Sequence, residues 1–145
     1  MPLEIIEIGD YKFIDPAKLD FENPEEVEAA VNAFIQQLSQ DPDANARVSS
    51  AAILGKTGKV AEAAIPALTQ AFQDQNYNVR LAAVAALKSI GTPEAIKATE
   101  YAIPSLVEIQ QDNNVPAGFH HSATMALQSI GTPKSTKHSM NTKNL

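Results

Sequence analysis

The chain has 145 residues, a formal net charge of −6 and no cysteine. This length suits one domain with a continuous core, and the absence of cysteine excludes disulfides, thiolate zinc sites and cysteine nucleophiles. An acidic balance without a basic stripe argues against binding to nucleic acid. No stretch reaches the roughly 20 apolar residues that cross a membrane, so we expect a cytoplasmic protein with no membrane partner.

The first 24 residues differ in pattern from the rest of the chain. Acidic residues interrupt the apolar ones, which is unlike the basic start and unbroken apolar centre of a secretion signal. The Gly9-Asp10 pair permits a short hairpin, and Pro16 argues against a helix. We expect residues 1–24 to cap the helical hairpin that follows, with an acidic docking arm as the alternative. Its apolar residues need burial: Ile5, Ile6, Ile8, Phe13, Ile14 and Phe21.

The first helix has a clear start signal. Asn23 precedes Pro24, and Glu26 follows three residues after the asparagine. This order is typical of a helix whose N-cap is Asn and whose first helical residue is Pro. We predict a helix from this point to about Gln40.

The chain then repeats itself. The segment Asn45–Gly58 aligns with Asn78–Gly91 at an offset of 33 residues, and again with Gly118–Gly131 after a further 40. The related blocks AIPAL and AIPSL precede the second and third copies. A period of this size is typical of helical solenoids, in which each unit is a pair of helices. We expect a repeat domain over 25–133, with units at about 25–58, 62–91 and 98–131.

The second helix of each unit is indicated by periodicity and by its end. In the middle copy, apolar residues from Val79 to Ile90 recur at spacings of three and four, which marks the buried face of a helix. Each copy ends at a glycine, a residue that can take the left-handed conformation of a helix C-terminus. We therefore expect these helices to end at Gly58, Gly91 and Gly131.

The middle unit also carries a spaced motif. Pro66, Asp74 and Arg80 are separated by eight and then six residues, which resembles the pattern of HEAT repeats. The resemblance implies a ladder of Asp and Arg side chains between neighbouring repeats, made here by Asp41 with Arg47 and by Asp74 with Arg80.

The outer units depart from this motif. The first unit has Ala33 where the proline is expected, and the third keeps Pro104 and Asp112. In place of the arginine, the third unit offers Gly118 or, if two residues are inserted, His120. Such departures suit the terminal units of a solenoid.

Within the HEAT family, the segment VRLAAVAALKSIG is most similar to the short repeats named for phycobilisome lyases. This resemblance covers about residues 26–133. It implies an all-α fold, a right-handed α-solenoid of about three HEAT-like hairpins with a short N-terminal capping segment. It also implies a scaffold that binds another protein. The alternative is a phycobilin lyase or lyase-like chaperone that acts on a phycobiliprotein together with a second HEAT-repeat subunit.

The binding surface of a solenoid is built from one outward position repeated in successive units. Alignment of the second helices gives three such rows, two of them small or apolar where a solvated face would be charged, which predicts a shallow groove for an apolar helix or loop. Packing by another segment or a second copy is the alternative. Charged and polar residues at the edges, Lys56 among them, would tune specificity. The rows are Val48, Leu81 and His121; Ala52, Ala85 and Met125; and Gly55, Lys88 and Gln128.

Catalytic and metal-binding patterns are weak. His120 and His121 are adjacent, so on a helix they point about 100° apart and cannot both face one ligand. The nearest carboxylates, Glu108 and Asp112, lack a recognised ligand spacing. We expect no cofactor and no metal, with His120 in place of the ladder arginine and His121 exposed. The polar tail 134–145 has too few apolar residues to fold, and we expect it to be disordered.

Overall fold

The computed structural model describes residues 5–8, 11–14 and 23–130. Within these ranges helices dominate, and a two-stranded antiparallel hairpin precedes them. Its strands are β1 (Ile5–Ile8) and β2 (Tyr11–Ile14), with Glu7 opposite Lys12. The hairpin permitted by Gly9-Asp10 therefore forms. Its role as a cap stays a prediction, because most of the segment lies outside the described residues.

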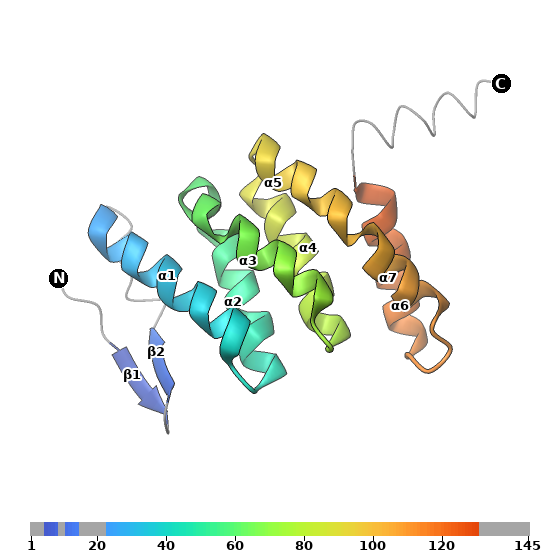
Figure 1. Cartoon of the computed structure of the whole chain (residues 1–145), viewed down its shortest axis with the longest axis horizontal. Coiled ribbons are helices and arrows are strands. Elements are labelled where there is room, and N and C mark those ends of the chain that lie inside the picture. Colours follow the sequence, from blue (N-terminus) through green and yellow to red (C-terminus); the bar gives the residue numbers. More distant parts are fainter. Residues whose placement is uncertain (1–4, 9–10, 15–22, 131–145) are drawn as a thin grey trace.

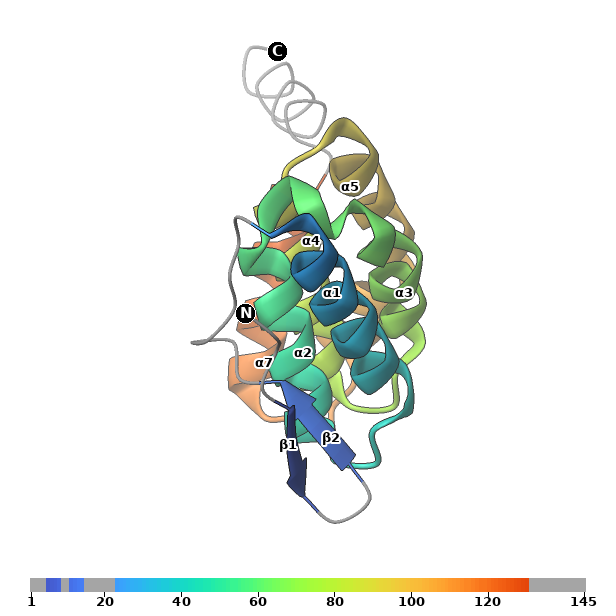
Figure 2. The ribbon, with the colours of Figure 1, turned by 90° about the vertical axis from the view of Figure 1, so that its left-hand side faces the viewer.

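The helices stack in two layers. One layer contains α1 (Pro24–Gln40), α3 (Ile65–Gln70) and α6 (Ile103–Gln111). The other contains α2 (Ala44–Lys56), α4 (Tyr77–Ile90) and α7 (Ala117–Ser129). Figure 1 shows the α1, α3 and α6 layer in front of the other layer, and Figure 2 looks along the row, with the two layers side by side. This arrangement confirms an all-α, HEAT-like helical solenoid.

Capping side chains fix where the long helices begin and end. The Asn23 Oδ1 accepts from the backbone N–H groups of Glu25 and Glu26 at 3.1 and 3.3 Å, so α1 starts where the sequence predicts. The helix ends at Gln40, also as predicted. Gly91 ends α4 with a φ of 72°, a left-handed conformation that favours glycine. The helix α2 ends at Lys56, two residues before Gly58, and Gly58 takes the predicted left-handed conformation with a φ of 65°. The Thr57 hydroxyl donates to the Leu54 carbonyl at this end. Gly131 lies outside the described residues.

Proline explains why, in the layer of α1, α3 and α6, the helix α1 is continuous whereas the helical segments of the other two units are interrupted. Pro66 and Pro104 each occupy the second position of a short helix, α3 and α6, and each helix follows a 3₁₀ segment. A proline lacks the N–H that would continue the preceding helix. Ala33 has that N–H, and α1 runs through it without a break. The short helical segments next to α3 and α6 are η2 (Gly58–Ala64), η3 (Ala71–Gln73), α5 (Pro93–Ala98) and η4 (Thr99–Ala102).

A single apolar core fills the space between the layers. Its largest side chains are fully buried and come from both layers. Burying one such side chain contributes roughly 1.5–3 kcal/mol, which makes this core the main source of stability. In the described ranges, no helix combines the length and apolar composition that a bilayer crossing needs. The fully buried core residues include Phe34, Leu54, Leu68, Phe72, Leu87, Leu106 and Ile109.

Candidate functional site

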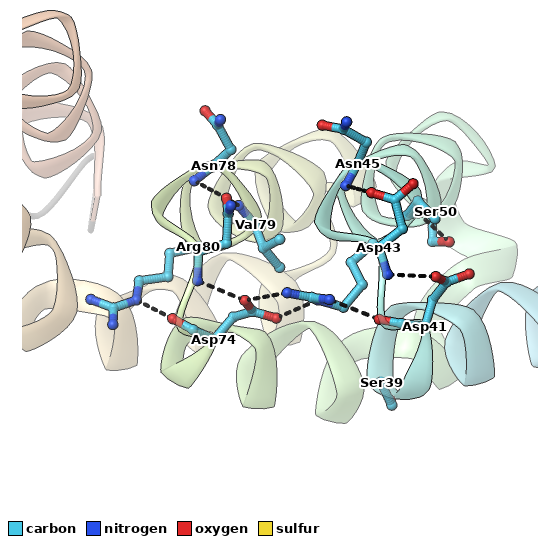
Figure 3. A network of polar contacts seen from close by, with 12 residues as sticks. Ser39, Asp41, Asp43, Asn45, Ser50, Asp74, Asn78, Val79 and Arg80 are labelled. Carbon is cyan, nitrogen blue, oxygen red and sulfur yellow. Dashed lines mark hydrogen bonds and ion pairs between the residues drawn. The ribbon is translucent and has the colours of Figure 1, made fainter. Parts of the chain in front are cut away.

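A polar ladder runs along the loops between the two layers. The Arg47 guanidinium donates from Nε and Nη2 to the two Asp74 carboxylate oxygens, at 2.9 and 3.1 Å, and from Nη1 to the Asp41 carbonyl at 2.7 Å. Figure 3 shows the hydrogen bonds around Asp41 and Asp74. The hydrogen bond to Asp74 raises the pKa of Arg47. This rung therefore joins an arginine of one unit to the aspartate of the next.

Each ladder aspartate also orders the turn in which it lies. The carboxylates of Asp41, Asp74 and Asp112 each accept the backbone N–H two residues later, at 2.8 Å in all three cases. This is the Asx turn that a short acidic side chain forms with its own backbone. Each aspartate thus orders the turn between the paired helices of its own unit, and Asp74 and Asp112 also bind a side chain of the preceding unit.

The second rung differs from the one that the resemblance implies. Arg80 donates from Nε to the Asp74 carbonyl, lies over the Tyr77 ring at 5.3 Å and reaches the exposed Glu108 at 3.4 Å. The Asp112 carboxylate instead accepts from the Tyr77 hydroxyl at 2.6 Å. Tyr77 occupies the position that Ala44 has in the first unit. If the second rung repeated the first, Arg80 would bind the Asp112 carboxylate, but the Tyr77 phenol binds it instead.

The Tyr77–Asp112 hydrogen bond shifts the pKa of both side chains. It lowers the pKa of Asp112, with a further contribution from the Asn114 N–H, because both donors stabilise the charged carboxylate. It raises the pKa of Tyr77, because loss of the phenolic proton would break the bond and place two negative charges together. The pair is therefore at its strongest when Asp112 is charged and Tyr77 is neutral.

His120 occupies the arginine position of the third unit. Its Nε2 lies 2.6 Å from the Asp112 carbonyl, the counterpart of the carbonyls that Arg47 and Arg80 contact in their own units. The neighbouring His121 is exposed on the surface of α7. Across the part of the chain that the structure describes, no three His, Asp or Glu side chains gather as a metal site would require.

A groove lies between α4 and α7. It has a volume of about 410 Å³. Five of the residues expected on the outward rows line it: Leu81, Ala85 and Lys88 from α4, and His121 and Met125 from α7. The structure therefore brings these five together on one surface.

The remaining row residues lie elsewhere. Val48 is half-buried and packs against the core, and Ala52 and Gln128 are exposed outside this groove, as is the edge residue Lys56. Gly55 is a correction to the rows, because it is buried against α4 instead of facing outward. A Cβ at Gly55 would lie 2.9 Å from the Ala86 Cα, closer than such atoms approach in proteins.

The same contact distinguishes the packing of α2 on α4 from the packing of α4 on α7. Alignment of the units places Lys88 and Ala126 where α2 and α4 have Gly55 and Ala86. Glycine lets α2 and α4 approach closely, whereas Lys88 and Ala126 both line the groove. The helices α4 and α7 accordingly share fewer close contacts than α2 and α4 do.

Alignment of rows missed four lining residues: Val84, Ser122, Ala126 and Ser129. Val84 is 3% exposed and forms part of the floor of the groove. The rows include only one set of outward positions, so they leave out the buried Val84 and the α7 residues beside the rows, of which Ser122 is exposed and Ala126 and Ser129 are half-buried. A helical projection that included the flanks of the core face would have found these positions.

Comparison with known proteins gives one family match. Residues 31–98 match the family model of HEAT repeats. No curated protein and no solved structure matches the chain. The matched segment contains Arg47 and Asp74, the pair that makes the side-chain rung between units. Residues 31–98 are therefore similar to HEAT repeats, and they lie within a HEAT-like helical solenoid.

Proposed function

We propose that the chain is a protein-interaction module and that the groove between α4 and α7 holds a segment of a partner protein. HEAT repeats generally serve as interaction scaffolds, which supports the general function. The observation that carries the proposed location is the hollow itself, in which Met125 is 54% exposed although it is a large apolar residue. Covering apolar side chains of this size contributes on the order of 1 kcal/mol each.

The charges at the groove suggest what the partner segment carries. Lys88 is positively charged, His121 offers ring nitrogens, and the described lining residues include no carboxylate. Leu81, Ala85 and Met125 supply apolar surface beside these groups. An amphipathic segment with acidic side chains beside its apolar ones complements both features.

A pair of alanines gives a matched test. Ala85 lines the groove, and Ala52 is exposed at the aligned position of α2 outside it. The probe is a fluorescent, leucine-rich amphipathic peptide with glutamates on its polar face, and its lysine counterpart is the control. We expect anisotropy to show tighter binding of the glutamate peptide, lost in Ala85→Glu and kept in Ala52→Glu. Equal binding to both variants would place the docking surface elsewhere.

The phycobilin lyase function rests on the sequence resemblance, without separate support among the described residues. A bilin carries carboxylates, so the same Lys88 and His121 would be its available partners in the groove. Co-expression with a bilin-producing system separates the two functions. Visible absorbance that purifies with the chain would favour the lyase.

A further inference from the structure

The two ends of this chain carry opposite charge. Residues 1–22 contain six acidic residues and two lysines, a net charge of −4, and residues 134–145 contain three lysines and no acidic residue, a net charge of +3. The groove with Lys88 and His121 lies in the part of the solenoid that adjoins the positive end. Figure 1 shows α1 and α7 at opposite ends of the row of helices.

The acidic end also has the apolar residues that a groove ligand needs. Residues 5–8 and 11–14 read IIEI and YKFI and pair as the β1–β2 hairpin. Glu4 and Asp15 flank the two strands directly. Apolar side chains beside carboxylates are the chemistry inferred above for the segment that binds the groove.

The positive tail is a poor occupant of the same groove. Its three lysines carry the same sign as Lys88, and its composition is nearly free of apolar residues. Like charges in contact oppose binding.

We propose that the groove between α4 and α7 binds residues 1–22 of a second copy of this chain, so that copies associate head to tail. This inference rests on the proposed function, because it names the partner of the same groove. The two surfaces differ, so the interface is heterologous and each dimer keeps one free groove and one free N-terminal segment. Association then continues into open chains and weakens as salt screens the charges.

Two variants that each damage one side test the proposal. Ala85→Glu places a carboxylate in the groove. The double variant Glu4→Lys and Asp15→Lys reverses the charges that flank the hairpin and leaves the Glu7–Lys12 cross-strand pair intact. In sedimentation velocity at low salt, the average mass of the native chain should rise with protein concentration and fall when salt is added. Each variant alone should stay monomeric, with an unchanged helical circular dichroism spectrum.

Mixing the two variants is the decisive step. The Ala85→Glu chain keeps an intact N-terminal segment, and the Glu4→Lys and Asp15→Lys chain keeps an intact groove. The mixture should therefore form a one-to-one dimer and no larger species. The Ala52→Glu chain should associate as the native chain does. A native chain that stays monomeric at low salt, or a mixture that forms no dimer, would overturn the inference. A monomeric native chain that still binds the glutamate peptide would leave the proposed function standing, whereas loss of both would remove both.

Discussion

Gly55 on α2 lies directly against Ala86 on α4, so close that a Cβ on the glycine would come within 2.9 Å of the Ala86 Cα. The contact sets the spacing of the first two units. Its counterpart in the next pair of units, Lys88 with Ala126, lines the groove. One residue difference between aligned positions thus separates a tight helix contact from a candidate docking surface.

Gly55→Ala should destabilise the fold even though alanine favours helices. The gain in helix propensity is about 1 kcal/mol, but overpacking against backbone costs typically 1–3 kcal/mol. We expect a net loss of about 1 kcal/mol in the free energy of unfolding, measured by urea denaturation. Gly118→Ala is the control, because a Cβ there meets open space. A stabilised Gly55→Ala chain would contradict the close contact.

Arg47→Lys should cost nearly as much stability as Arg47→Ala. Lysine keeps the charge but cannot donate to both Asp74 oxygens and the Asp41 carbonyl together, as the guanidinium does. Charge-assisted hydrogen bonds contribute roughly 1.5–3 kcal/mol, so we expect a loss of about 2 kcal/mol. Glu108→Gln, at the exposed end of an ion pair with Arg80, should change stability by less than about 0.5 kcal/mol. Comparable losses from Glu108→Gln and Arg47→Lys would contradict the ladder.

Tyr77→Phe should destabilise the chain at neutral pH and lose its effect in acid. The folded-state pKa of Asp112 is lowered, so its contribution is present above the unfolded value of 3.8 and is lost as pH falls through the folded value. The native and Tyr77→Phe chains should therefore approach equal stability at low pH. NMR titration should show the pKa of Asp112 moving up in the variant. An unchanged Asp112 titration would rule out the hydrogen bond.

The adjacent histidines should respond differently to substitution. His120→Ala removes the contact with the Asp112 carbonyl and should cost about 1 kcal/mol, the usual contribution of one hydrogen bond. His121→Ala removes an exposed side chain and should leave the unfolding midpoint unchanged while weakening peptide binding in the groove. Equal destabilisation by both substitutions would contradict the assignment of His120 to the ladder.

Local signals in the sequence were enough for several elements. Asn23 and Pro24 predicted the start of α1, and Gly91 predicted the end of α4, because caps act through the residues next to them. Repetition predicted the solenoid and placed five groove residues in aligned rows. These predictions need no knowledge of distant contacts.

Contacts between units were harder to predict. The resemblance implied that Asp41 pairs with Arg47 and Asp74 with Arg80, whereas the Arg47 guanidinium binds the Asp74 carboxylate and Arg80 binds only the Asp74 carbonyl. The next carboxylate, that of Asp112, accepts from Tyr77. Gly55 was assigned to an outward row because it aligns with Lys88, which lines the groove, although Gly55 itself is buried against α4. Both outcomes depend on which side chains meet across the interface between two units. One sequence alone does not show those distances.

The ladder holds the solenoid unevenly. A bidentate ion pair joins the first two units through Arg47 and Asp74, whereas a single phenolic hydrogen bond and a solvent-exposed ion pair join the second to the third. Repeat proteins open from the neighbour contacts that are weakest. The amide protons of α7 should therefore exchange with solvent before those of α2, and an occupant of the groove, which touches both α4 and α7, should slow that exchange by clamping the last unit to the rest.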